Sequence, residues 1–331
     1  MTKAIALLSG GLDSTLAVKL ILDQGIEVEA LNFVTPFCSC NRKGRGCEAR
    51  RVSDELGIPC KVVAVTDEFF RVIRSPKHGY GSGMNPCLDC RILMFSKARE
   101  RMAETGAAFV FTGEVLGQRP MSQHRRAMQV ITRESGLDGR LLRPLSARLL
   151  EPTIPELEGL VERERLLALH GRSRRPQIAL AGEQGVTDYP CPAGGCLLTD
   201  PGFARRMRDL VQFCPDFDLN DVNLLKVGRH FRLSPAARAV VGRNEDENRR
   251  LPALARRNDL LFEVKDCGSP ITLLRGDAGE REIHLAAALT ASYSDALGLQ
   301  VQVHYGTDCS AMDKAVVATP MDEARLAGLR I

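Results

Sequence analysis

The sequence predicts an α/β fold: a doubly wound parallel sheet in a first domain, followed by a smaller α+β domain. The chain has 331 residues, a length that suits two domains. Its apolar fraction of 44%, with 5% aromatic residues and no Trp, is typical of aliphatic sheets. Apolar runs alternate with helical stretches over the first two hundred residues and then become shorter. We therefore predict domains at residues 1–200 and 201–331.

Four strands separated by helices are predicted in the first domain. The strand candidates are the apolar runs at residues 4–8, 27–34, 61–65 and 108–112. The main helical stretches are residues 15–22, 48–56 and 88–104. Because strands separated by helices of this length pair in parallel, we expect the ligand site beyond their carboxyl ends.

The second domain is predicted to mix helices with short strands. A helix at residues 203–213 opens it, and an Ala-rich helix follows at residues 283–297. The strand candidates are residues 223–227, 230–233, 260–265, 271–275 and, as the last strand, 300–305. This order of elements is typical of an α+β domain.

A glycine loop joins the first strand to the first helix, and its residues are Ser9, Gly10, Gly11, Leu12, Asp13, Ser14 and Thr15. A strand, a glycine turn and a helix together point backbone N–H groups at an anion, and the hydroxyls add donors. Asp13 suits a Mg²⁺ that accompanies phosphates, because this ion prefers oxygen ligands. The loop matches neither the Walker pattern nor the dinucleotide pattern. The alternative is an ordinary strand-to-helix turn.

The cysteines form two further groups of candidate site residues. No signal peptide or membrane-spanning apolar run is present in the sequence, so we expect a cytoplasmic protein in which thiols stay reduced. Cys87 and Cys90 open a predicted helix, where a thiol has a lowered pKa. Cys191 and Cys196 bound a glycine-rich loop. Three or four thiolates from these segments would hold zinc or an iron–sulfur cluster, and the alternative is isolated buried thiols.

The remaining cysteines and the basic residues are less specific. Cys38, Cys40 and Cys47 would bind zinc or lie near the active site at the end of the second strand. Packing is expected for the single cysteines, which are Cys60, Cys214, Cys267 and Cys309. The net charge of +4 proves no nucleic-acid partner, and the basic clusters at residues 124–126, 172–175 and 205–206 are typical of a solvated surface.

Several segments of the first domain resemble known enzymes. The glycine loop resembles the PP-loop of ATP pyrophosphatases, whose fold is HUP-like. Residues 112–123 and 142–145 resemble segments of the tRNA thiouridine synthetase ThiI, and Asn85 to Cys90 with Phe95 resembles a segment of MnmA. Cys196 lies where those enzymes carry a second catalytic cysteine. The resemblance covers roughly residues 1–200.

This resemblance implies an ATP-dependent tRNA sulfurtransferase. ATP would be bound by Ser9, Gly10, Gly11, Asp13, Ser14, Thr15, Asn32, Phe33, Gly113 and Gln118. The enzyme would use Asp13, Cys90 and Cys196 to adenylate a uridine, release pyrophosphate, and replace the uridine oxygen with sulfur. Mg²⁺ would stabilise the departing charge. Similarity to ThiI favours 4-thiouridine as the product.

One departure from the family concerns the sulfur site. Cys87 stands where the MnmA segment has an aspartate, and a CxxC pair with a distant cysteine resembles enzymes that hold a 4Fe–4S cluster on three cysteines. The implied ligands are Cys87, Cys90 and Cys196, with Cys191 as the alternate. A persulfide route on Cys90 and Cys196 is the other mechanism. We expect no rhodanese region in the chain, so sulfide, a cysteine desulfurase or a persulfide carrier would supply sulfur.

The second domain resembles the NFACT RNA-binding domain at residues 240–248, 269–275 and 286–294. This resemblance implies tRNA as partner. The arginines that would contact phosphates are Arg229, Arg232, Arg243, Arg249 and Arg275. The alternative is a small docking domain without RNA contact.

Two other functions remain open at the level of sequence. One is a PP-loop ligase that acts on a small molecule and carries a cysteine-bound zinc. The other is an RNA-binding protein without turnover. The sequence also leaves open the uridine position, the sulfur donor, the role of Cys38, Cys40 and Cys47, and the oligomeric state, including a homodimer.

Overall fold

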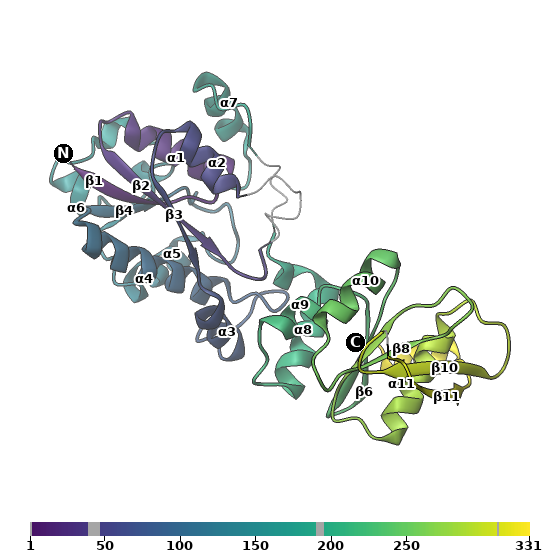
Figure 1. Ribbon diagram of the computed structural model, residues 1–331. Coiled ribbons are helices and arrows are strands. Elements are labelled where there is room, and N and C mark those ends of the chain that lie inside the picture. The colour runs from purple at the N-terminus through teal and green to yellow at the C-terminus, as the bar shows by residue number, and fades with distance from the viewer. Residues whose placement is uncertain (1, 39–46, 190–194, 310) are drawn as a thin grey trace. The chain divides into compact units, whose positions relative to one another are not determined.

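The computed structural model describes residues 2–38, 47–189, 195–309 and 311–331. The chain forms two compact units, Met1–Asp200 and Pro201–Ile331, which we call the N-terminal and the C-terminal unit (Figure 1). Each unit has its own sheet, and each is described by itself below. No helix in the described ranges is long and apolar enough to cross a membrane.

The N-terminal unit is built on a parallel sheet, as the sequence predicted, but the sheet has five strands instead of the four predicted. Its order is β3-β2-β1-β4-β5. The strands are β1 (Lys3–Leu7), β2 (Glu27–Val34), β3 (Cys60–Ala64), β4 (Phe109–Thr112) and β5 (Leu141–Leu142). The chain order reverses beside β1, whose neighbours are β2 and β4. The loops after β1 and β4 therefore meet at one edge of the sheet, where ligands bind in folds of this kind.

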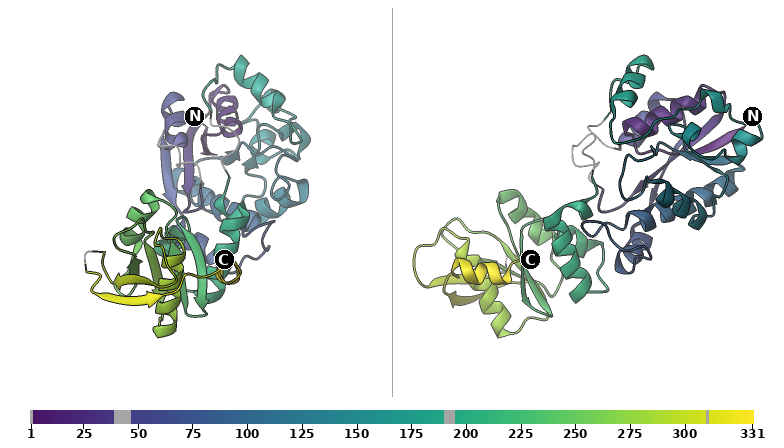
Figure 2. Two further views of the ribbon diagram at one scale, coloured as in Figure 1. Left: turned by 90° about the vertical axis from the view of Figure 1, so that its right-hand side faces the viewer. Right: turned by 180° about the vertical axis from the view of Figure 1, so that it is seen from behind.

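Helices cover both faces of this sheet. They are α1 (Leu12–Leu22), α2 (Glu48–Glu55), α3 (Thr66–Arg74), α4 (Cys87–Thr105), α5 (Arg125–Glu134), α6 (Ile154–Leu157) and α7 (Arg175–Glu183). Figures 1 and 2 show α1 and α2 over one face, and α4 and α5 over the other. The predicted helices are found with shifted ends, whereas α3, α5, α6 and α7 were not predicted.

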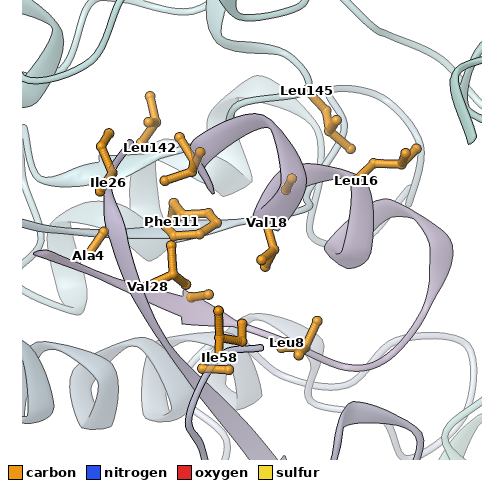
Figure 3. Close-up of a cluster of buried hydrophobic side chains, with 14 of the residues drawn as sticks. Ala4, Leu8, Leu16, Val18, Ile26, Val28, Ile58, Phe111, Leu142 and Leu145 are labelled. Carbon is orange, nitrogen blue, oxygen red and sulfur yellow. The ribbon is translucent and has the colours of Figure 1, made fainter. Parts of the chain in front are cut away.

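The side chains of β1 alternate between two hydrophobic clusters, because successive residues of a strand point to opposite faces. Ala4 and Leu8 lie with Leu16 and Val18 of α1 in the cluster that Figure 3 shows. Ile5 lies on the other face, in a cluster that includes residues of α4 and α5. β1 is therefore held from both sides, and so is the start of the loop that follows it.

The C-terminal unit contains an antiparallel sheet of six strands, in the order β11-β10-β8-β9-β7-β6. The strands are β6 (Arg229–Ser234), β7 (Ala237–Val241), β8 (Leu260–Glu263), β9 (Thr272–Gly276), β10 (Val301–Gly306) and β11 (Lys314–Ala318). The helices are α8 (Pro201–Phe213), α9 (Leu219–Leu224), α10 (Glu245–Leu254), α11 (Glu280–Ser292) and α12 (Glu323–Leu329). The predicted α+β architecture is confirmed.

Three predictions for this unit are wrong in detail. Residues 223–227 form no strand, because Asp218 and Asp221 make a capping box that starts α9 and the helix runs to Leu224. The strand at residues 300–305 is not the last, since β11 pairs with it in an antiparallel hairpin. The Ala-rich helix α11 starts at Glu280 and ends at Ser292 instead of residue 297.

Candidate active site

The glycine loop is shaped by close packing against two other segments. Gly10 has a φ of +75°, and a Cβ at this position would lie 2.5 Å from the backbone carbon of Glu48 in α2. Gly113, which follows β4, lies against the loop from the opposite side. A Cβ there would lie 2.4 Å from the backbone oxygen of Asp13. Both positions therefore need glycine for a close approach of two backbones.

The hydroxyl groups of the loop bond within the first turn of α1. Ser14 Oγ donates to the Gly11 carbonyl oxygen at 2.8 Å, and Thr15 Oγ1 donates to the same oxygen at 3.1 Å. Ser9 Oγ lies 3.1 Å from Ser14 Oγ. Ser14 and Thr15 are buried, whereas Ser9 is exposed. These bonds fix the turn, so the backbone N–H groups at the start of α1 face the site in a defined arrangement.

Asp13 is the centre of a polar cluster. Its Oδ2 accepts hydrogen bonds from Gln118 Nε2 at 2.7 Å and from the Arg174 guanidinium at 3.2 Å. Gln118 Oε1 in turn accepts a bond from Gln177 Nε2 at 3.0 Å. Asp13 Oδ1 has no partner among the described residues, although it is buried. The structure thus brings two predicted residues, Asp13 and Gln118, into direct contact.

Sequence reasoning missed Arg174 and Gln177. Arg174 belongs to the basic cluster that we attributed to a solvated surface. In the structure it is the residue before α7, and its guanidinium forms an ion pair with Asp13. Gln177 is 1% exposed. The available signal was the spacing of Arg174 and Gln177, because residues three apart at the start of a helix lie on one face of it.

Three arginines lie around the site. Partial burial of its guanidinium lowers the pKa of Arg119, and the charges of Arg91 and Arg174 lower it further. Asp13 and Cys87 raise the pKa of Arg119, so Arg119 lies within electrostatic reach of both the glycine loop and the cysteines. Arg91 also lies 3.5 Å from Glu114. The region between loop and cysteines is therefore basic.

The predicted adenine contact lies at the end of β2. Asn32 Nδ2 donates to the Leu8 carbonyl oxygen at 2.8 Å, so this side chain holds the ends of β1 and β2 together. β1 pairs with β2 only as far as Leu31, whereas β3 pairs with β2 as far as Val34. The backbone of Phe33 on the β1 side therefore lies outside the strand ladder, so its polar groups are not used by a β1 partner.

The cysteines of three segments come together near the loop. Cys87 starts α4, as predicted. Cys38 and Cys196 are partners in an isolated antiparallel bridge, beside a hydrogen bond of 2.9 Å from the Leu197 N–H to the Phe37 oxygen. The Met84 N–H donates to the Leu198 oxygen at 2.9 Å, which ties the segment before α4 to the same place. Cys38 thus lies beside Cys196, although the sequence analysis placed these two cysteines in separate groups.

The pKa values of these thiols correct one prediction. Burial raises the pKa of Cys90 to about 12, although Arg91 lowers it, and the charges of Cys196, Cys87 and Cys38 raise it further. Burial also raises the pKa of Cys196 to about 12, and Cys38 and Cys87 add to the rise. A helix start was expected to lower the pKa of the thiols at Cys87 and Cys90. At Cys90 the loss of water outweighs that effect.

The described cysteines do not form a site for one ion. Within these ranges, no three His, Cys, Asp or Glu side chains lie close enough together to hold a metal ion. A single zinc with Zn–S distances of about 2.3 Å would need its sulfurs within about 4 Å of one another. The alternate ligand Cys191, and Cys40, lie outside the described residues.

Cys47 is separate from this group. Its thiol donates to Asn32 Oδ1 at 3.5 Å, and the residue packs against the hydrophobic cluster under α1 and α2. The contacts of Cys47 are therefore those of a packing residue.

The predicted RNA-contacting arginines differ in their surroundings. Arg275 is buried at 7% exposure, where its guanidinium pairs with Asp259 at 2.7 Å and with Asp221 at 3.0 Å. The expectation that Arg275 contacts a phosphate is therefore corrected, because this charge is satisfied inside the unit. Arg243 and Arg249 are exposed, and each pairs with a glutamate four residues away in sequence.

Two other arginines of that set bond within the C-terminal unit. Arg232 binds Asp209 through its Nε at 3.1 Å and lies 4.6 Å from the ring centre of Phe213. Arg229 lies 4.7 Å from the ring centre of Tyr293. Both are partly exposed, so phosphate contact at these two residues stays a prediction.

Two family models match parts of the chain. Residues 1–148 match the model for the thiamine biosynthesis protein ThiI, and residues 228–328 match the model for the NFACT protein RNA binding domain. The resemblances that the sequence predicted, to thiouridine synthetases of the ThiI and MnmA type and to the NFACT RNA-binding domain, are confirmed.

Curated relatives match somewhat more than a third of the chain or slightly less. It is 31% identical over 139 residues to the tRNA-specific 2-thiouridylase MnmA of Bradyrhizobium sp. (strain ORS 278), which is 38% of this chain and 35% of the relative. The MnmA of Syntrophotalea carbinolica is 32% identical over 114 residues, which is 32% of each chain. The chain thus spans about a third of the length of these relatives.

Solved structures give weaker matches. A crystal structure of a 4-thiouridine synthetase–RNA complex with bound ATP is 23% identical, covers 68% of this chain and 52% of that chain, and gives a TM-score of 0.38. The C-terminal part of the fibronectin/fibrinogen-binding protein from Streptococcus suis is 14% identical, covers 80% of this chain and 97% of that chain, and gives a TM-score of 0.29. These TM-scores are too low to support an argument about this chain.

Proposed function

We propose that the protein is an ATP-dependent tRNA sulfurtransferase that adenylates a uridine and replaces its oxygen with sulfur. The observation that carries this proposal is the meeting of two segments at Asp13. Gly113 lies against the backbone of Asp13, and Gln118 binds its carboxylate at 2.7 Å. Both come from the segment that resembles ThiI, and the basic region around Arg119 leads from them to the cysteines.

The glycine loop would bind the phosphates of ATP. The backbone N–H groups at the start of α1 and the exposed hydroxyl of Ser9 are the donors, and the backbone of Phe33 receives the adenine. Asp13 Oδ1 is buried without a partner among the described residues, so it suits the Mg²⁺ that accompanies a triphosphate. When bound, Mg²⁺ neutralises phosphate charge.

Adenylation would prepare the uridine for sulfur. The uridine carbonyl oxygen attacks the α-phosphorus, and the bond to the bridging oxygen breaks with its electron pair leaving on pyrophosphate. The former carbonyl oxygen then departs with AMP when sulfur attacks the ring carbon. Resemblance to ThiI favours 4-thiouridine, whereas the named relatives are 2-thiouridylases.

The thiols Cys87, Cys90 and Cys196 would hold a 4Fe–4S cluster, and three ligands would leave one iron open to an external sulfur. Cys38 lies beside Cys196 in the chain segment after β2. When bound, such a cluster carries the sulfur that sulfide or a persulfide carrier supplies. Thiols with a pKa of about 12 are protonated at neutral pH and react slowly, which argues against a metal-free persulfide route on Cys90 and Cys196. A bound metal removes this obstacle, since it displaces the thiol protons.

The C-terminal unit would hold the tRNA by its backbone. We favour phosphate contacts at two exposed arginines, Arg243 before α10 and Arg249 on it. The match to the NFACT RNA-binding domain supports an RNA partner, and the match to ThiI makes tRNA the RNA that we propose.

The experiment that tests the function is mass spectrometry of tRNA nucleosides from a strain that lacks the protein. We expect one thiouridine to disappear, the wild-type chain to restore it, and Asp13→Ala to fail to restore it. An unchanged set of thiouridines would overturn the proposal. ATP–pyrophosphate exchange that needs a small metabolite instead of tRNA would favour the ligase alternative.

A further inference from the structure

Arg174 and Gln177 carry polar atoms beside Asp13 and Gln118 that no group of the described residues satisfies. Arg174 lies 3.2 Å from Asp13 Oδ2, yet its Nε has no hydrogen-bond partner among the described residues. Gln177 Oε1 and Asp13 Oδ1 are also buried, and they too have no hydrogen-bond partner among the described residues. Unpaired buried polar atoms are costly, so three of them at one place indicate a ligand. The Arg174 donor suits an anion, whereas the acceptors Gln177 Oε1 and Asp13 Oδ1 suit the cation that accompanies it.

The position of Arg174 is set by packing, and not only by its ion pair. Ala181 of α7 is 1% exposed in the core under α1. Lys19 Nζ of α1 donates to the Gln184 oxygen at 2.9 Å, at the far end of α7. The Gly171 N–H donates to the Leu116 oxygen at 2.7 Å, so the segment before α7 is tied to the segment that carries Gln118.

The charges around Asp13 do not balance. Asp13 faces two cations, Arg174 and Arg119, and Arg119 forms no ion pair with any residue that the structure describes. The starts of α1 and α7 add partial positive charge, because both helices begin near Asp13. One carboxylate thus faces two arginines and two helix starts, and an anion is needed to complete the set.

We infer that Arg174 at the start of α7 contacts the β- and γ-phosphates of ATP, and that Gln177 Oε1 faces the cation that accompanies them. Arg174 exchanges its bond to Asp13 for the triphosphate, which frees the Asp13 carboxylate for the cation that accompanies ATP. When the bond from the α-phosphorus to the bridging oxygen breaks, the electron pair moves onto pyrophosphate. The guanidinium then stabilises that charge. This inference rests on the proposed use of ATP.

The test compares three variants of the full-length chain by calorimetric titration with Mg·ATP and with AMP. Arg174→Gln removes the charge, Arg174→Lys keeps the charge but loses the planar fork, and Arg172→Gln is the matched control from an exposed position of the same segment. We expect Arg174→Gln to bind ATP at least tenfold more weakly and AMP within twofold of wild type. Arg174→Lys falls between them, and Arg172→Gln matches wild type.

Two results would overturn the inference. One is an ATP affinity of Arg174→Gln equal to that of Arg172→Gln. The other is an equal loss for ATP and AMP with a lower melting temperature, since that pattern means that Arg174 only supports the loop. A wild-type chain that binds no ATP would instead refute the proposed function itself, so the two failures are distinguishable.

Discussion

Gly113→Ala is the substitution whose effect follows most directly from the structure. A Cβ at Gly113 would lie 2.4 Å from the Asp13 backbone oxygen and 2.5 Å from the Ser14 nitrogen. Ordinary contact begins at 3.4 Å, so the glycine loop and the loop after β4 must separate by about 1 Å. Neither obstacle is the end of a flexible side chain, and both loops are anchored to neighbouring central strands. The separation therefore moves Asp13 away from Gln118.

A shift of about 1 Å at a reacting centre reduces the rate about 100-fold, and overpacking costs about 1–3 kcal/mol of stability. We expect Gly113→Ala to lose at least that factor in tRNA-dependent ATP–pyrophosphate exchange while it remains folded by circular dichroism. Gly182→Ala in α7 is the control, because a Cβ there meets nothing within 4 Å. Exchange by Gly113→Ala above a tenth of the wild-type rate would refute this reasoning.

Four further predictions concern the thiols and the C-terminal unit. Cys87→Ser, Cys90→Ser and Cys196→Ser are expected to lower the iron bound after anaerobic reconstitution, whereas Cys60→Ser at β3 keeps it; equal iron in all four variants would contradict the shared site. Because the pKa of Cys90 and Cys196 is raised from 9.0 to about 12 in the folded state, their stabilising contribution in the metal-free protein is complete below pH 9 and declines as the pH rises from 9 toward 12. Melting temperatures across that range test this, with Cys90→Ser expected to show a smaller decline. Arg275→Met leaves Asp259 without its partner and is expected to destabilise the C-terminal unit by about 3–5 kcal/mol in urea unfolding. Arg249→Gln breaks only an exposed ion pair with Glu245, so it is expected to leave stability almost unchanged, weaken tRNA binding and reduce its salt slope by about 1, and an unchanged slope would place the RNA elsewhere.

The local part of the site was predictable from sequence because it depends on neighbours in the chain. Strand, glycine turn and helix at residues 3–22 follow from hydrophobic pattern and glycine chemistry, and the parallel sheet follows from the alternation of strands and helices. The start of α4 at Cys87 was predictable for the same reason. The strands β7 and β11 were missed, since short buried strands carry weak patterns and pair with segments that are distant in sequence.

Side-chain partners and burial were not predictable, because they depend on which segments meet in space. Arg275 matched a family segment, but only the fold places it between Asp221 and Asp259. Cys90 lies in the first turn of α4, but the loss of water around it raises its pKa instead of lowering it.

The sequence by itself determined the fold class, the glycine loop and the set of thiols, because composition, periodicity and turn chemistry are local properties. Only the tertiary structure decided which of these residues share a site. It brought Arg174 from the start of α7 to Asp13 and paired Cys38 with Cys196 across a bridge. Contacts between residues more than 150 positions apart depend on the packing of whole helices and strands, and sequence spacing does not predict them.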